Sequence, residues 1–107
     1  MKPILVTGGT GFVGRHVVRD LIERGHQVRV LARKPEKAAR LARATGCQVV
    51  RGDVLNPESV RKAMEGVSGV VHLVGIIFEK GESTFERIHV EGTRNVVDAA
   101  KACGVTR

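Results

Sequence analysis

VTGGTGFVGRHVV, residues 6–18, joins a stretch typical of a buried strand to one typical of an amphipathic helix through four glycines. A strand that ends at Thr7 must turn sharply into the helix, and Gly8 permits the positive φ that such a turn requires. Gly11 has no Cβ and lets an anion lie close to the backbone, while Gly14 allows the helix to pack tightly against its own strand. This stretch therefore predicts a strand, a glycine turn and a helix in direct succession.

The start of the predicted helix offers a binding site for a diphosphate. Backbone N–H groups of the first turn, near Phe12 and Val13, lack partners within the helix, and the positive end of the helix dipole lies behind them. The GxxGxxG spacing by itself also occurs in ordinary tight turns. Here an apolar strand precedes it and a second strand follows at the distance expected for dinucleotide binding. The predicted contacts are Gly8, Thr10, Gly11, Phe12, Val13 and Gly14.

The rest of the chain alternates apolar runs with segments of helical period, which indicates βαβ units. Strands are expected at residues 3–7, 26–33, 48–53 and 69–75, and helices at 12–25, 35–46, 56–66 and about 84–103. The predicted fold class is α/β, a Rossmann-type doubly wound parallel sheet of about four strands in the order 3-2-1-4, with helices on both faces. We expect one domain over residues 1–107, the N-terminal portion of such a fold, truncated before its fifth strand.

Local signals mark the ends and the inner faces of these helices. Asn56 is expected to cap a helix that has Pro57 at its first position, and Gly46 is expected to end the preceding helix. The helix after the glycine turn is expected to bury one apolar stripe, made of Val13, Val17, Val18, Leu21 and Ile22.

The composition excludes several classes of protein. With 42% hydrophobic content, 107 residues suffice for one core and little more. Cys47 and Cys103 form no CxxC pair, so we expect no disulfide or zinc site but two small buried side chains in a cytoplasmic protein. The histidines show no spacing shared by metal ligands, and no metal is predicted. The longest apolar run, residues 69–78, is too short to cross a bilayer, so no membrane insertion is expected.

The formal charge of +7 suits a nucleic acid, an anionic lipid or a phosphorylated small molecule, and much of the surplus falls between Arg29 and Lys62. Three Phe and no Trp or Tyr leave few side chains on which bases could stack, so nucleic acid is not expected as a partner. Many of these cations can equally form the solvated face of a helix.

Four segments in this order and spacing carry a family resemblance: TGGTGFVG (7–14), GDVLNPESV (52–60), GVVHLVG (69–75) and HVEGTRNVVDAAKACGV (89–105). They resemble the N-terminal half of extended and atypical short-chain dehydrogenases/reductases, the NAD(P)-binding epimerase/dehydratase superfamily. The pairing of HLVGIIFE (72–79) with STFERIHVEGTRNV (83–96) is most similar to the branch of the NADPH-binding accessory subunit of respiratory complex I.

The resemblance implies further cofactor contacts at the ends of two strands. Asp53 and the backbone of Val54 would bind the adenine edge. The alternative is that Asp53 caps the following helix, although Asn56 and Pro57 already mark that start. The backbone at Leu73, Val74 and Gly75 would run under the adenosine half of the cofactor.

Arg33 indicates which cofactor is bound. It stands at the end of the second predicted strand, where NAD-selective proteins place an acidic residue for the ribose 2′-hydroxyl. A guanidinium instead offers a fork of donors to a 2′-phosphate, and Lys34 adds positive charge. NADP(H) is therefore expected over NAD(H).

The sequence leaves the activity open. Reductases and epimerases of the resembled family use a Ser or Thr after the fifth strand and a Tyr-x-x-x-Lys helix, and this chain has no Tyr, so no catalytic residue is predicted. Three functions remain: the cofactor-binding half of an oxidoreductase or nucleotide-sugar epimerase/dehydratase-like protein, a non-catalytic NADP(H)-binding structural or redox-sensing module in a larger assembly, and, more remotely, an RNA-binding basic domain. Self-association is expected through the edge of the fourth strand, because its sequence is apolar.

Overall fold

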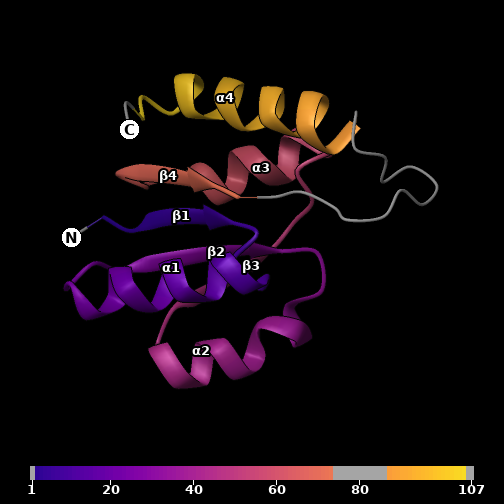
Figure 1. The fold of residues 1–107 in the computed structure, drawn as a ribbon. Coiled ribbons are helices and arrows are strands. Elements are labelled where there is room, and N and C mark those ends of the chain that lie inside the picture. The colour runs from indigo at the N-terminus through magenta and orange to yellow at the C-terminus, as the bar shows by residue number, and fades with distance from the viewer. Residues whose placement is uncertain (1, 74–86, 106–107) are drawn as a thin grey trace.

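A parallel sheet of four strands forms the centre of the computed structural model, which describes residues 2–73 and 87–105 (Figure 1). The strands lie in the order β3-β2-β1-β4, with bounds β1 Ile4–Thr7, β2 Val28–Ala32, β3 Gln48–Arg51 and β4 Gly69–His72. The helices are α1 Phe12–Glu23, α2 Ala39–Thr45, α3 Pro57–Met64 and α4 Thr93–Ala102. A 3-10 turn, Pro35–Ala38, precedes α2, and a π-helical segment, Arg87–Gly92, precedes α4. The predicted fold class and strand order are confirmed.

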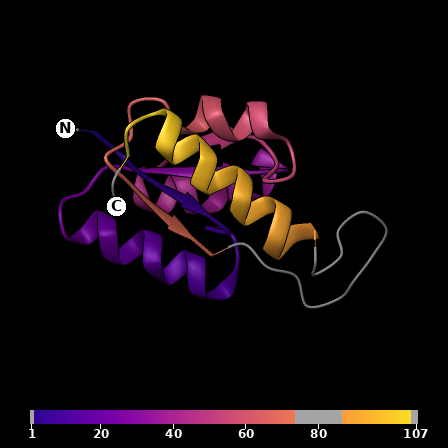
Figure 2. The ribbon, with the colours of Figure 1, turned by 90° about the horizontal axis from the view of Figure 1, so that it is seen from above.

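Helices cover both faces of the sheet because the strands alternate buried side chains between them. On β1, Leu5 packs with α3 and α4, whereas Val6 packs with α1 and α2. Figures 1 and 2 show α3 and α4 together over one face and α1 and α2 over the other. The chain therefore has two apolar layers, one on each side of the sheet, and each crossover helix returns to the start of a parallel strand.

The predicted helix boundaries hold where a specific residue sets them. Asn56 Oδ1 accepts hydrogen bonds from the backbone N–H groups of Glu58 and Ser59, at 3.0 and 3.2 Å, with Pro57 at the first helical position. Gly46 ends α2 with a left-handed φ of 79°. The expected start of the last helix near residue 84 lies outside the described residues.

Three side chains that were expected to be buried are exposed, and one of them is Val97, which helical period placed on the inner face of the last helix but whose exposed fraction is 44%. Val13 belongs to the first turn of α1, beyond the end of the strands, and 60% of its surface remains exposed, whereas Val18 one turn later is fully buried. Cys103 follows the last turn of α4 and is exposed, whereas Cys47 is buried beside α2. The helical period identifies which side chains share one face of a helix. It does not show where that helix extends beyond the sheet against which it packs.

Arg29 has a structural role that its positive charge did not suggest. From the face of β2 that carries α3, its Nη1 donates to the carbonyls of Ala63 and Glu65, each at 2.7 Å. These carbonyls lie at the C-terminal end of α3, where a helix leaves acceptors unpaired. Part of the positive charge therefore serves to join a helix end to the sheet.

We expect Arg29→Met to lower the free energy of unfolding by about 1–3 kcal/mol, because two carbonyls lose a charged donor. Arg40→Met is the matched control, since Arg40 is exposed on α2. Urea unfolding followed by far-UV circular dichroism measures both variants. Equal stability of the two would show that Arg29 contributes nothing to the attachment of α3.

Candidate dinucleotide-binding site

The predicted site residues gather along one edge of the sheet. Because all four strands are parallel, their carboxyl ends share this edge, and each strand delivers its candidates there. The structure brings together Gly8 to Gly14 after β1, Arg33 and Lys34 after β2, Asp53 and Val54 after β3, and Leu73 after β4. Val74 and Gly75, the remaining two candidates, lie outside the described residues.

Two of the glycines after β1 are required by the fold. Gly8 has a φ of 75°, a conformation that side chains disfavour, and its carbonyl accepts a hydrogen bond from the N–H of Gly11 at 3.2 Å. At Gly14 a Cβ would lie 1.9 Å from the Gly8 carbonyl oxygen and 2.7 Å from the Gly9 Cα. Helix α1 can therefore pack on the turn only with glycine at position 14.

Gly11 differs, because the fold itself does not require a glycine there. Its φ of −76° and ψ of 175° are extended values that any residue adopts. A Cβ at this position would meet only the Gly8 carbonyl oxygen, at an ordinary 3.5 Å. The missing side chain leaves open space beside the start of α1. A diphosphate fits this arrangement, since it needs close access to the backbone and not a particular φ.

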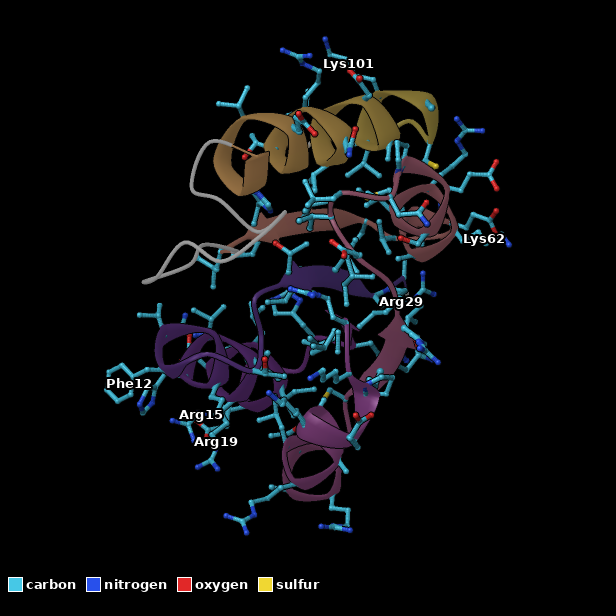
Figure 3. The ribbon with its side chains drawn as sticks, turned by 90° about the vertical axis from the view of Figure 1, so that its right-hand side faces the viewer. Phe12, Arg15, Arg19, Arg29, Lys62 and Lys101 are labelled. Atoms are coloured by element: carbon cyan, nitrogen blue, oxygen red, sulfur yellow. The ribbon has the colours of Figure 1, made fainter. Side chains whose placement is uncertain are left out.

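The first turn of α1 is suited to an anion. Gly11 is its N-cap and provides no side-chain acceptor, and this fully described helix has no acidic residue in its first turn. Its leading N–H groups and the positive end of its dipole are therefore available to an external anion. Phe12 and Val13 border the turn, with 72% and 60% of their surfaces exposed, and Phe12 points away from the body of the molecule (Figure 3).

Arg33 and Asp53, which were predicted to contact different parts of a cofactor, lie side by side. Arg33 Nε is 3.6 Å from Asp53 Oδ2, and both side chains are substantially exposed. The other carboxylate oxygen of Asp53 accepts the N–H of Leu55 at 2.9 Å. Since Asn56 is the cap of α3, the alternative that Asp53 caps this helix is wrong. Lys34 is exposed next to Arg33.

Sequence reasoning missed the hydrogen bonds that hold the strand ends at this edge. Thr7 Oγ1 lies 2.6 Å from His72 Nδ1 and accepts the N–H of Leu73 at 3.1 Å. On the far side of the ring, His72 Nε2 lies 3.0 Å from Thr93 Oγ1 at the start of α4. The sequence signal that could have indicated these hydrogen bonds is a polar residue in each of two apolar strands. Which partners they would meet depends on tertiary packing.

The described residues include neither a cluster of metal ligands nor a membrane-spanning helix. No group of three or more His, Cys, Asp or Glu side chains among residues 2–73 and 87–105 could hold a metal ion. No helix in this part of the chain is long and apolar enough to cross a membrane.

Comparison with known proteins identifies the family of the chain. A family model described as NAD(P)H-binding matches residues 8–107. A 3-beta-hydroxysteroid dehydrogenase from Mycolicibacterium neoaurum is 38% identical over 97% of this chain and 30% of its own length. The chain thus spans about a third or less of the curated relatives that it matches.

Solved structures share the fold as well as the sequence pattern. A short-chain dehydrogenase/reductase superfamily protein from Agrobacterium tumefaciens with bound NAD has a TM-score of 0.79 at 37% identity, covering 97% of this chain and 30% of its own. The triphenylmethane reductase of Citrobacter sp. complexed with NADP(H) has a TM-score of 0.76 at 33% identity, covering 96% and 34%. The resemblance to short-chain dehydrogenases/reductases is confirmed at the level of the superfamily. Together with the glycine turn and the 3-2-1-4 sheet, these matches show that the chain belongs to the NAD(P)H-binding family.

Proposed function

We propose that this chain binds NADP(H) in preference to NAD(H), as the cofactor-binding part of a short-chain dehydrogenase/reductase or an epimerase/dehydratase-like protein. The observation that carries the proposal is the open space at Gly11, at the N-terminus of a helix with no acceptor of its own. A side chain there would cost the fold little, so the small size of Gly11 serves a ligand. The diphosphate of the cofactor is that ligand.

The adenosine end of the cofactor would lie along the carboxyl ends of β2 and β3. Arg33 and Lys34 provide positive charge at the end of β2, and the chain has no carboxylate at those two positions to repel a 2′-phosphate. The Arg33 guanidinium and the Asp53 carboxylate already lie 3.6 Å apart, so they present one donor group and one acceptor group to adenosine. The solved relatives hold NAD in one case and NADP(H) in the other, so family membership does not decide the cofactor, and in our proposal Arg33 and Lys34 decide it.

When bound, the nicotinamide of the cofactor supplies hydride transfer. In this proposal the described residues act on the adenosine and diphosphate part of the cofactor. They hold the diphosphate, place the adenosine and neutralise the 2′-phosphate. No residue of the chain is proposed as a catalyst. Such a site is compatible with two functions, the cofactor-binding part of a reductase and a non-catalytic NADP(H)-binding module of an assembly. NADPH oxidation by the full-length protein, tested with aldehyde and ketone substrates, separates these two possibilities.

The first test of the proposal concerns Gly11. We expect Gly11→Val to abolish NADPH binding in isothermal titration while the far-UV circular dichroism and the melting temperature stay nearly unchanged, because the side chain fills the space of the diphosphate. Gly14→Ala provides the contrast: its Cβ would strike backbone atoms and should destabilise the fold by about 1–3 kcal/mol or more. If Gly11→Val binds NADPH as tightly as the wild type, the diphosphate lies elsewhere.

The second test concerns selectivity. Arg33→Met should weaken NADPH binding about tenfold to a hundredfold, since a charge-assisted bond to a phosphate is lost, and should change NADH binding far less. Arg40→Met again serves as the control for a general loss of positive charge. Equal losses of affinity for NADPH and NADH would mean that Arg33 contacts adenine and does not bind the 2′-phosphate. An affinity for RNA that falls steeply as the salt concentration rises, and that does not change when NADPH is added, would favour the alternative of an RNA-binding basic domain.

The third expectation concerns self-association. In the described sheet β4 lies at an edge, and its two valines are only partly buried. We propose that a second copy pairs with this edge, because unpaired strand edges readily add a strand. Sedimentation velocity should show a species that grows with concentration. A single monomeric species at all concentrations would contradict this expectation.

A further inference from the structure

We propose that Thr93 and Asn95, in the first turn of α4, are positioning residues that tie together the two strand ends between which the adenosine half of the cofactor would lie. We call this pair the α4 tie. Neither side chain is among the predicted cofactor contacts. The part of this inference that concerns cofactor affinity rests on the proposed function, whereas the part that concerns the geometry of the strand ends does not.

The two residues of the α4 tie form hydrogen bonds with different strand ends. Thr93 Oγ1 lies 3.0 Å from His72 Nε2 at the end of β4. Asn95 Nδ2 donates to the carbonyl of Val54, in the loop after β3, at 2.7 Å. Residues two apart on a helix point about 200° away from each other, so one turn can serve two separate neighbours. The sheet order places β3 and β4 at opposite ends, with β2 and β1 between them.

On the β4 side, the hydrogen bonds fix the tautomer of His72. Thr7 is fully buried, and its Oγ1 already accepts the N–H of Leu73, so its hydroxyl proton needs an acceptor. His72 Nδ1, at 2.6 Å, is that acceptor. In this arrangement we assign the ring proton to Nε2, which then donates to Thr93. This series of bonds connects α4 to Thr7, the residue that directly precedes Gly8 of the glycine turn.

On the β3 side, Asn95 holds the segment that carries Asp53. Val54 is 4% exposed, and without Asn95 its carbonyl would lose the donor of a 2.7 Å bond. The neighbouring bonds are local: Asp53 N–H donates to Ser59 Oγ, and Asp53 Oδ1 accepts from Leu55. The bond from Asn95 comes from α4, 41 residues further along the chain, and it helps to set the height of this segment relative to the sheet.

Apolar packing holds the inner face of α4 against the fold. Val96 and Ala99 are 4% and 5% exposed in the layer shared with α3. Figure 2 shows α4 running alongside α3 over this face of the sheet. Apolar contacts are not directional, whereas the two polar bonds fix where particular atoms lie. Removing the α4 tie should therefore loosen the strand ends more than it weakens the fold.

The test compares Asn95→Ala and Thr93→Val with Arg94→Ala, which alters an exposed residue between them. Hydrogen exchange without ligand should rise at least tenfold at residues 53–55 in Asn95→Ala. In Thr93→Val, the Leu73 amide at the end of β4 should likewise exchange at least tenfold faster, because His72 loses its link to α4, and Thr93→Ser should restore the wild-type rate. Arg94→Ala should change neither measurement. Wild-type exchange at 53–55 in Asn95→Ala, or wild-type exchange of the Leu73 amide in Thr93→Val, would overturn the proposal.

Binding measurements then separate the α4 tie from the proposed function. Adenosine 2′,5′-bisphosphate should bind Asn95→Ala about tenfold more weakly, whereas inorganic diphosphate should bind it as it binds the wild type. Equal weakening of both probes would indicate general destabilisation and contradict a positioning role. If the wild type binds neither probe nor NADPH, the proposed function fails, and the hydrogen-exchange results decide the geometric part of the inference on their own.

Discussion

The approach of helix α1 to the glycine turn is the contact on which the rest of this structure depends. A Cβ at Gly14 would lie 1.9 Å from the Gly8 carbonyl oxygen, so the helix can lie against the turn only because no side chain intervenes. This contact places the N-terminus of α1 at the end of β1, in the middle of the sheet edge. The open N-terminus of α1 at Gly11, where we propose that the diphosphate binds, and the buried position of Val18 both follow from that placement.

The parallel sheet then distributes charge between its two ends. At the carboxyl end, Arg33 and Lys34 stand beside the turn and are exposed. Toward the other end of β2, Arg29 donates to the carbonyls that close α3 and serves the fold. The formal charge of +7 therefore has at least two physical uses, and only the part at the carboxyl end bears on a phosphorylated ligand.

Much of the fold could be predicted from the sequence because local signals agree with one another. Apolar runs, the Asn56 cap and the glycine turn all specify the same alternation of strands and helices, and the order 3-2-1-4 follows from the resemblance that they carry. Residues at the strand ends could be placed for the same reason. What could not be predicted depends on contacts between layers. Period alone put Val13 in the core, although α1 begins beyond the sheet.

The polar contacts of the site could not be predicted from the sequence for a similar reason. Nothing in the local sequence of Asn95 or His72 says that one will meet the Val54 carbonyl and the other Thr7, since their partners lie 41 and 65 residues away. The pairing of Arg33 with Asp53 likewise required the strands to be placed side by side. Sequence patterns identify which residues reach the functional edge, whereas packing decides how they are held there.

The central claim is that a dinucleotide binds at the carboxyl edge of this sheet, and its most direct test is a ¹H–¹⁵N NMR titration of the chain with NADPH. The account predicts that the amide shifts will concentrate at residues 8–14 and at Arg33 and Asp53, with the amides near Arg29 unchanged. Shifts confined to the surface around Arg29 and Lys62, or no shifts at saturating NADPH, would contradict it.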